Sequence, residues 1–199
     1  MSSPRRAGPY VIVLAGPNGA GKSTFYDLFL DGLPVPFINA DRIARTVFRG
    51  RQSVDYEAAR IADAERRRLI AERQSFVMET VLSDPAGDKV EFLRRARDAG
   101  FLVVLVYIGL DSPELAAARV AHRVRSGGHD VPTARIGPRF GRSLANLRKA
   151  LPIVDRAYLY DNSATPYVRV AVVARGRTLW RSARLPRWMR GVLPASDRK

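Results

Sequence analysis

The sequence has 199 residues and a formal net charge of +15, with 34 lysine and arginine residues against 19 acidic ones. This length fits one domain that buries a substantial hydrophobic core. Cysteine is absent from the sequence, which excludes a disulfide framework and a thiolate metal site. The first apolar run ends at Gly16 and is too short for a signal peptide or a membrane span, so we expect a cytoplasmic protein with no membrane partner.

Arginine supplies nearly all of the positive charge, because the only lysines are Lys22, Lys89, Lys149 and Lys199. The arginines spread through almost every segment and form no single block. Such a balance attracts anionic partners, nucleic acid among them. No motif that combines aromatic and basic residues for RNA binding accompanies the charge. We therefore favour a solvated, arginine-rich surface with some phosphate-handling arginines over a nucleic-acid interface.

Residues 1–9 show no periodicity and are expected to form a tail. Residues 10–15 then form an apolar strand that leads into the pattern Gly-x-x-x-x-Gly-Lys-Ser, followed by a helix to about residue 30. Glycines let successive N–H groups point at phosphate oxygens, lysine reaches the outer phosphates, and the serine hydroxyl is a ligand for Mg²⁺. The pattern predicts a nucleoside triphosphate site with Ser23 as the metal ligand. Its residues are Gly16, Pro17, Asn18, Gly19, Ala20, Gly21, Lys22, Ser23 and Thr24.

Strands and helices alternate along the rest of the chain. Further strands are expected at residues 36–39, 75–80, 101–108, 158–161 and 168–173, and helices from residue 41 and at 54–73, 88–99, 113–126 and 133–150. This alternation predicts an α/β fold of the P-loop NTPase type, in which helices cover both faces of a parallel sheet. The domain is expected to span residues 10–175. Residues 186–199 form a basic tail, which Trp188 indicates is partly packed.

Two polar clusters follow predicted strands, and in a parallel sheet such strand ends meet in the crevice where ligands bind. The first cluster contains Asn39 and Asp41, and the second contains Glu79 and Thr80. Asp41 could accept the proton of an acceptor hydroxyl, or serve only as the cap of the helix that begins there. Glu79 could bind substrate hydroxyls or a water on Mg²⁺. The sequence does not identify a second protein ligand for Mg²⁺ besides Ser23.

A cationic lid is expected over residues 113–149, where two predicted helices are separated by a hinge at Gly127-Gly128. Arg119 and Arg123 lie one helical turn apart on the first helix, and Arg139 lies on the second. Closing such a lid would place guanidinium groups over the phosphates and exclude water.

Several of these motifs together resemble the zeta-toxin family of small kinases. The matching segments are residues 15–25, 38–44, 79–83, 127–132, 139–147 and 160–163, in the same order along the chain. The resemblance implies an ATP-dependent kinase that phosphorylates the 3′-hydroxyl of the sugar in UDP-N-acetylglucosamine, and it implies a possible antitoxin partner. It implies that Asp41 is the catalytic base, that Glu79 and Thr80 bind the substrate, and that Arg123 and Arg139 are the lid arginines.

This sequence is more compact than the plasmid toxins, lacks their extended substrate-binding insertion, and resembles the short chromosomal members. Two other functions stay open at this stage. The positive charge favours a polynucleotide or nucleotide kinase. A binding module that uses ATP only as a switch is the second alternative. The polar clusters at Asp41 and Glu79 argue against the switch, which needs no carboxylate on the acceptor side.

Overall fold

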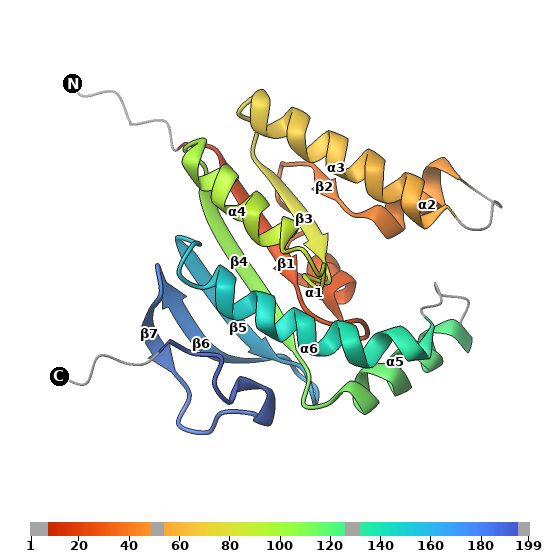
Figure 1. Ribbon diagram of the computed structural model, residues 1–199, viewed down its shortest axis with the longest axis vertical. Coiled ribbons are helices and arrows are strands. Elements are labelled where there is room, and N and C mark those ends of the chain that lie inside the picture. Colours follow the sequence, from red (N-terminus) through yellow and green to blue (C-terminus); the bar gives the residue numbers. More distant parts are fainter. Residues whose placement is uncertain (1–7, 49–53, 126–131, 195–199) are drawn as a thin grey trace.

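The computed structural model describes residues 8–48, 54–125 and 132–194, and within them it shows one seven-stranded sheet flanked by helices (Figure 1). The strands are β1 (Tyr10–Ala15), β2 (Phe37–Ile38), β3 (Phe76–Thr80), β4 (Leu102–Gly109), β5 (Arg156–Asp161), β6 (Val168–Ala174) and β7 (Arg177–Arg181). The helices are α1 (Lys22–Phe29), α2 (Ala40–Val47), α3 (Asp55–Ala71), α4 (Asp88–Asp98), α5 (Pro113–Arg125), α6 (Thr133–Ala150) and the short 3₁₀ helix η1 (Arg187–Met189).

The strand order is β2-β3-β1-β4-β5-β6-β7, and the first five strands are parallel. This part confirms the expected α/β fold. The sheet is mixed: the expected parallel arrangement holds for five of the seven strands, and β6 and β7 run antiparallel to their neighbours. Only six residues join β5 to β6, too few for the helical crossover that a parallel pair requires. Strand β7 was not predicted from the sequence.

Strand β7 forms a hairpin with β6 through Arg175 and Gly176. Both residues have positive φ values, of 46° and 78°. Two-residue hairpin turns commonly adopt this left-handed backbone because its twist matches that of the strands. Arginine is not a typical residue for such a turn, which is why the hairpin was missed.

Alternating side chains of the central strands feed two hydrophobic clusters, one on each face of the sheet. On β1, Val11 and Val13 point to the face covered by α3, α4 and the C-terminal half of α6. Leu14 points to the opposite face, where α1 and α5 pack. From Leu105 onward the apolar run of β4 is buried on both faces, as expected for a central parallel strand, whereas Leu102 at its start is 52% exposed. Packing in these two clusters fixes the positions of the carboxyl ends of β1 and β3, which border the candidate site described below.

The C-terminal segment, residues 182–194, packs on the face of the sheet to which Val11 and Val13 point. Trp188 and Met189 of η1, together with Val192, are buried in its cluster. The indole lies over Gly109, where an added Cβ would come within 2.2 Å of the ring, and its Nε1 donates a hydrogen bond to Asp161 Oδ1 at 2.8 Å. The first part of the segment expected as a tail from residue 186 is therefore part of the folded core.

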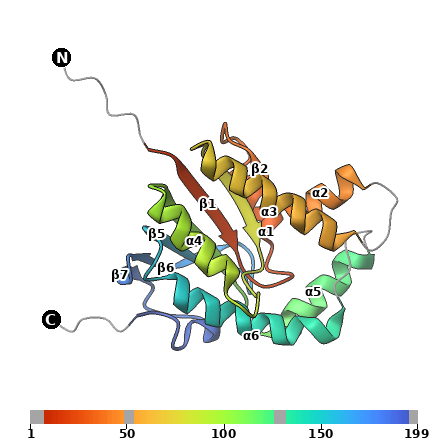
Figure 2. The same cartoon turned by 45° about the horizontal axis from the view of Figure 1, so that its top comes forward.

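The two helices expected to form a lid lie side by side near the carboxyl ends of the parallel strands (Figure 2). Ser112 caps α5 by accepting a hydrogen bond from Leu115 N, as the sequence predicted. The predicted hinge at Gly127-Gly128 lies outside the described residues, as does most of the tail at residues 1–9. Among the described residues, no helix combines the length and apolar character needed to cross a membrane.

Candidate active site

The loop between β1 and α1 has the backbone of a phosphate cradle. Gly16, Gly19 and Gly21 have φ values of 146°, 73° and 86°, a region that residues with a Cβ rarely adopt. An added Cβ would also lie 2.2 Å from Ile108 O at the first position and 2.7 Å from Ala116 O at the second. Both the torsion angles and the close packing therefore require glycine in this loop.

Two side chains from beyond β5 hold the loop from outside. Asn162 Nδ2 donates a hydrogen bond to Ala20 O at 2.9 Å, and the Tyr167 hydroxyl donates one to Gly21 O at 2.8 Å. An added Cβ on Gly21 would lie 2.7 Å from the same Asn162 amide. These bonds engage two carbonyls of the loop, and the N–H groups at the start of α1, which no side chain caps, are suited to bind an anion. Neither residue was predicted from the sequence to support the loop, although Asn162 lies within one of the matching motifs.

Lys22, Ser23 and Glu79 form a compact polar cluster with Asn39. Glu79 Oε2 accepts hydrogen bonds from Ser23 Oγ at 3.0 Å and from Asn39 Nδ2 at 2.8 Å. Lys22 Nζ lies 3.7 Å from Glu79 Oε1 and donates a hydrogen bond to Pro17 O at 3.1 Å. A hydroxyl beside a carboxylate is the oxygen donor set that Mg²⁺ prefers.

Burial lowers the pKa of Lys22 below its usual value of 10.5, because the charged ammonium loses its hydration. The carboxylates of Glu79 and Asp41 act in the opposite direction, and the Arg123 guanidinium lowers the pKa further. The side chain is only 7% exposed. The cluster thus holds a desolvated cation at the position where the motif places the outer phosphates of a nucleotide.

Helix α2 begins one residue earlier than expected, and the expectation that Asp41 starts it was wrong. Asn39 is the N-cap, since its Oδ1 accepts a hydrogen bond from Arg42 N at 3.1 Å. An amide is as good a cap as a carboxylate, and Asn39 also reaches Glu79. Asp41 lies in the first turn and lines the cavity described next. Its carboxylate is therefore not the capping group.

A cavity of about 500 Å³ opens beside this cluster. It brings together Asn39, Asp41, Glu79, Thr80 and Arg139, all of them predicted site residues, with Asn18 of the phosphate loop at its border. Four cationic side chains line it, only one of which was predicted to belong to the site; the four are Arg66, Lys89, Arg139 and Arg142.

The loop after β3 forms one wall of the cavity and is attached to α6 by side-chain hydrogen bonds. Arg142 Nε donates to Ser83 O at 2.9 Å and Ser143 Oγ donates to Val81 O at 2.7 Å. Asn146 Nδ2 contacts two further carbonyls of this loop at 3.2 and 3.0 Å, those of Leu82 and Asp84. Helix α6 therefore carries Arg139 and fixes the cavity wall at the same time.

The predicted lid arginines occupy different positions. Arg139 lines the cavity, whereas Arg123 lies close enough to Lys22 to affect its pKa. Arg119 Nη2 donates a hydrogen bond to Ser163 O at 3.3 Å, next to the phosphate loop. Arg139 thus lies at the cavity, and the other two arginines lie nearer the phosphate loop.

Two buried oxygen atoms beside the cavity have no hydrogen-bond partner among the described residues: Asn18 Oδ1 and Asp84 Oδ1. Buried polar atoms are normally paired, so these two are available to a ligand or to water. The described part of the chain contains no group of three or more histidine, cysteine, aspartate or glutamate side chains suited to a metal ion.

Together, the strand order, the glycine cradle and the lysine at the start of α1 define a P-loop NTPase fold of the kinase type. The family model described as an AAA domain matches residues 11–138, and the chain belongs to this family. An uncharacterized protein of Haemophilus influenzae (strain ATCC 51907 / DSM 11121 / KW20 / Rd) is 34% identical over 119 residues, which cover 59% of this chain and 83% of that protein.

Solved structures support the fold. The AvrRxo1-ORF1:-ORF2 complex contains a chain with a TM-score of 0.71 and 19% identity, and the match covers 95% of this chain. The same match covers only 65% of the length of that relative. The PezAT chromosomal toxin-antitoxin system of Streptococcus pneumoniae gives a TM-score of 0.60 and 20% identity, covering 86% of this chain and 72% of the other.

Proposed function

We propose that this protein is an ATP-dependent kinase that transfers the γ-phosphoryl group to a hydroxyl of an anionic small molecule, with a nucleotide sugar similar to UDP-N-acetylglucosamine as the acceptor. The observation that carries the proposal is the cavity that joins Asp41 to the phosphate loop across Glu79. A nucleotide switch needs only the loop. A kinase also needs a pocket for its acceptor with a carboxylate at the border, and the cavity lined by Asp41 supports this function over a switch.

On the nucleotide side, residues 16–24 would bind the phosphates of ATP through backbone N–H groups and the α1 N-terminus. Lys22 would leave Pro17 O and Glu79 to neutralise the outer phosphates. Ser23 would ligate Mg²⁺, and Glu79 would bind one of the ion's waters, as its 3.0 Å contact with the Ser23 hydroxyl suggests. Bound Mg²⁺ neutralises the charge that develops on the transferred group.

On the acceptor side, Asp41 would orient the hydroxyl and accept its proton. A carboxylate of ordinary basicity is sufficient, because the hydroxyl becomes acidic only as transfer proceeds. Asn39 performs the capping, which leaves the Asp41 carboxylate available for this role. Thr80 and Asn39 line the same cavity and would position the sugar.

The cations of the cavity suggest the charge of the acceptor. Arg139 and Arg142 line it from α6, while Arg66 and Lys89 line it from α3 and α4. Asp63 pairs with both Arg66 and Lys89, whereas no ion pair among the described residues engages Arg139 or Arg142. The carboxylates of Asp41, Glu79 and Asp84 line the same cavity, so the two arginines of α6 are the cations left to contact an anionic group. Guanidinium groups are suited to diphosphates because they donate paired hydrogen bonds. This charge and the resemblance to zeta toxins both favour a nucleotide sugar.

A polynucleotide or nucleotide kinase is the second candidate, since the same cations would bind a nucleic-acid end and the net charge is +15. Nucleic-acid binding falls steeply with salt when many phosphates are contacted, whereas binding of one diphosphate changes less. The PezAT chromosomal toxin-antitoxin system and the AvrRxo1-ORF1:-ORF2 complex each combine a chain similar to this one with a second component, so an antitoxin partner is part of the proposal.

The proposal is tested by measuring ADP release with nucleotide sugars, simple sugars, nucleosides and 5′-hydroxyl oligonucleotides as acceptors. We expect turnover with UDP-N-acetylglucosamine or a close analogue. Lys22→Ala should lose this turnover while the fold persists. Asp41→Asn should bind Mg²⁺–ATP as the unmodified protein does but transfer phosphate at least about a hundredfold more slowly, the scale expected for loss of a general base.

Asp27→Asn is a matched control, because this carboxylate is exposed and pairs with Arg42 away from the cavity. Unchanged transfer by Asp41→Asn would reduce that residue to a surface carboxylate. Turnover with oligonucleotide ends, and with none of the nucleotide sugars, would assign the protein to the second candidate.

A further inference from the structure

Strand β7 is one of the two edges of the sheet, and it is longer than the two-residue strand β2 at the other edge. It is the last strand in the order, and within the described part of the chain no strand pairs with its outer side. An open edge presents a row of N–H and C=O groups that can pair with another extended chain. Leu179 and Trp180 on this strand are 55% and 45% exposed. The edge is therefore both available for backbone pairing and partly apolar.

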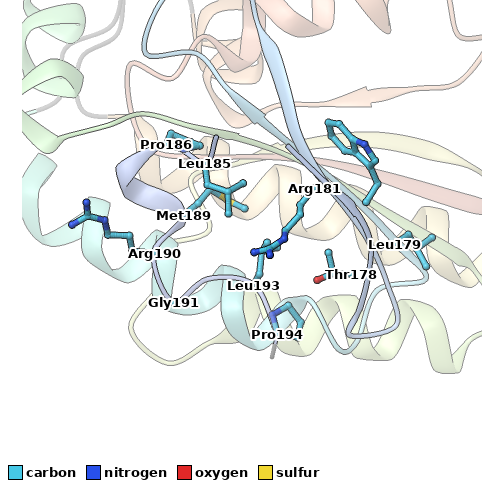
Figure 3. Close-up of a pocket in the computed structure, with 11 residues that line it drawn as sticks. Thr178, Leu179, Arg181, Leu185, Pro186, Met189, Arg190, Gly191, Leu193 and Pro194 are labelled. Carbon is cyan, nitrogen blue, oxygen red and sulfur yellow. The ribbon is translucent and has the colours of Figure 1, made fainter. Parts of the chain in front are cut away.

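A groove of about 550 Å³ lies beside this edge, between β7 and the C-terminal segment (Figure 3). Leu185, Met189 and Leu193 line it from the segment, and Thr178 and Arg181 line it from β7. The Oγ1 atom of Thr178 is buried and has no hydrogen-bond partner among the described residues. The groove thus combines an apolar wall with an unsatisfied hydroxyl, as expected for a pocket that receives a side chain from a bound segment.

The charge around the edge is predominantly positive. Residues 162–196 contain no acidic residue and seven arginines, at positions 169, 175, 177, 181, 184, 187 and 190. Among the described residues, Arg175 is the only one of these seven that forms an ion pair, with Asp155. The Arg169 guanidinium lies 5.4 Å from the centre of the Trp180 ring. This surface is complementary to an acidic partner.

A second copy of the chain fits the edge poorly. If two β7 strands paired antiparallel about Leu179, Arg177 of one copy would oppose Arg181 of the other at both ends of the pair. Like charges directly opposite each other destabilise a strand pair. Nucleic acid would use the arginines but not the aliphatic wall of the groove or the free backbone edge. An extended acidic peptide uses all three features.

We propose that the β7 edge binds an acidic, extended segment of a partner protein, which pairs with β7 as an added strand and places an apolar side chain in the groove. Strand addition of this kind obtains affinity from backbone hydrogen bonds and specificity from pockets for alternate side chains. The proposal does not depend on the kinase function, because the edge and the groove lie outside the cavity lined by Asp41.

The test uses a fluorescent ten-residue peptide in which glutamate alternates with valine or leucine, and fluorescence anisotropy measures its binding to the full chain. Two control peptides accompany it: one with alternate backbone amides N-methylated, and one with lysine in place of glutamate. We expect the acidic peptide to saturate at micromolar concentrations, and N-methylation or charge inversion to weaken it at least about tenfold.

Protein variants locate the site. Leu179→Lys and Arg181→Glu change exposed side chains of the edge and should each weaken binding at least about tenfold. Leu28→Lys and Arg94→Glu are matched controls on α1 and α4, where a leucine and an arginine are similarly exposed. They should leave binding unchanged.

Equal binding of the N-methylated peptide would overturn strand addition, and absence of binding at about 1 mM peptide would overturn the site itself. Tighter binding of a single-stranded oligonucleotide, lost in Arg181→Glu, would show a nucleic-acid surface instead. A dimer in sedimentation that dissociates in Leu179→Lys would show that a second copy covers the edge.

Discussion

The support that Asn162 gives to the phosphate loop leads to the most specific prediction. In Asn162→Ala, the carbonyl of Ala20 loses its donor at 2.9 Å. Asn162 is 6% exposed and Ala20 is fully buried, so water cannot readily replace the amide. An unpaired buried acceptor costs about 1–3 kcal/mol in the free energy of unfolding. For a chain of 199 residues, each kcal/mol shifts the melting temperature by about 2–4 °C.

We therefore expect a loss of about 2–12 °C in thermal unfolding of Asn162→Ala, measured by calorimetry. If the phosphate loop also changes conformation when this bond is lost, the affinity of the protein for Mg²⁺–ATP in isothermal titration should fall by about 5- to 150-fold. This range is the cost of about 1–3 kcal/mol expressed as a change in binding constant. Tyr167→Phe is the matched comparison, because its hydroxyl makes the equivalent bond to Gly21 O at a less buried position and should cost less. A melting temperature within about 1 °C of the unmodified protein, with unchanged affinity, would refute this account of the loop.

Three further predictions test other parts of the structure. Gly109→Ala should lower stability by about 1–3 kcal/mol in chemical unfolding, because its Cβ would meet the Trp188 ring at 2.2 Å, and an unchanged midpoint would show that the ring moves aside. Lys22→Met should raise the melting temperature of the nucleotide-free protein at neutral pH. Because the pKa of Lys22 is lowered in the folded state, the buried charge destabilises the fold at neutral pH, and this cost decreases as the pH rises toward 10.5, the pKa of the unfolded state. The gain in melting temperature of Lys22→Met over the unmodified protein should therefore shrink between pH 7 and 10.5. A gain that does not change with pH would contradict this reasoning. Asn146→Ala should raise the acceptor KM in steady-state kinetics and leave the ATP KM unchanged, since it frees two carbonyls of the cavity wall; equal changes in both constants would remove this positioning role.

The nucleotide side of the site could be predicted from the sequence because its determinants are local. The glycine spacing, the lysine and the preceding apolar strand lie within fifteen consecutive residues, 10–24. The strand-end rule also placed Asp41 and Glu79 in one crevice, and the structure shows both lining a single cavity. Local patterns combined with one topological rule were sufficient for these residues.

The remaining features depend on contacts between distant segments. Asn162 reaches a carbonyl 142 positions earlier in the chain, and Asn146 reaches one 64 positions earlier. Polar residues in such positions look the same in the sequence as any surface asparagine. The direction of β6 was missed for a different reason: an apolar strand has the same pattern whether its neighbour is parallel or antiparallel, and only the length of the connection distinguishes the two.

The bonds from Asn162 and Tyr167 also matter for deciding where the functional unit ends. The family match stops at residue 138, yet the two side chains that hold the loop carbonyls come from residues 162 and 167. A fragment cut to the matched region would keep the whole glycine motif and lose both supports, along with β5. Engineered fragments or chimaeras of this protein should therefore extend through β6, so that both side chains that hold the phosphate loop are kept.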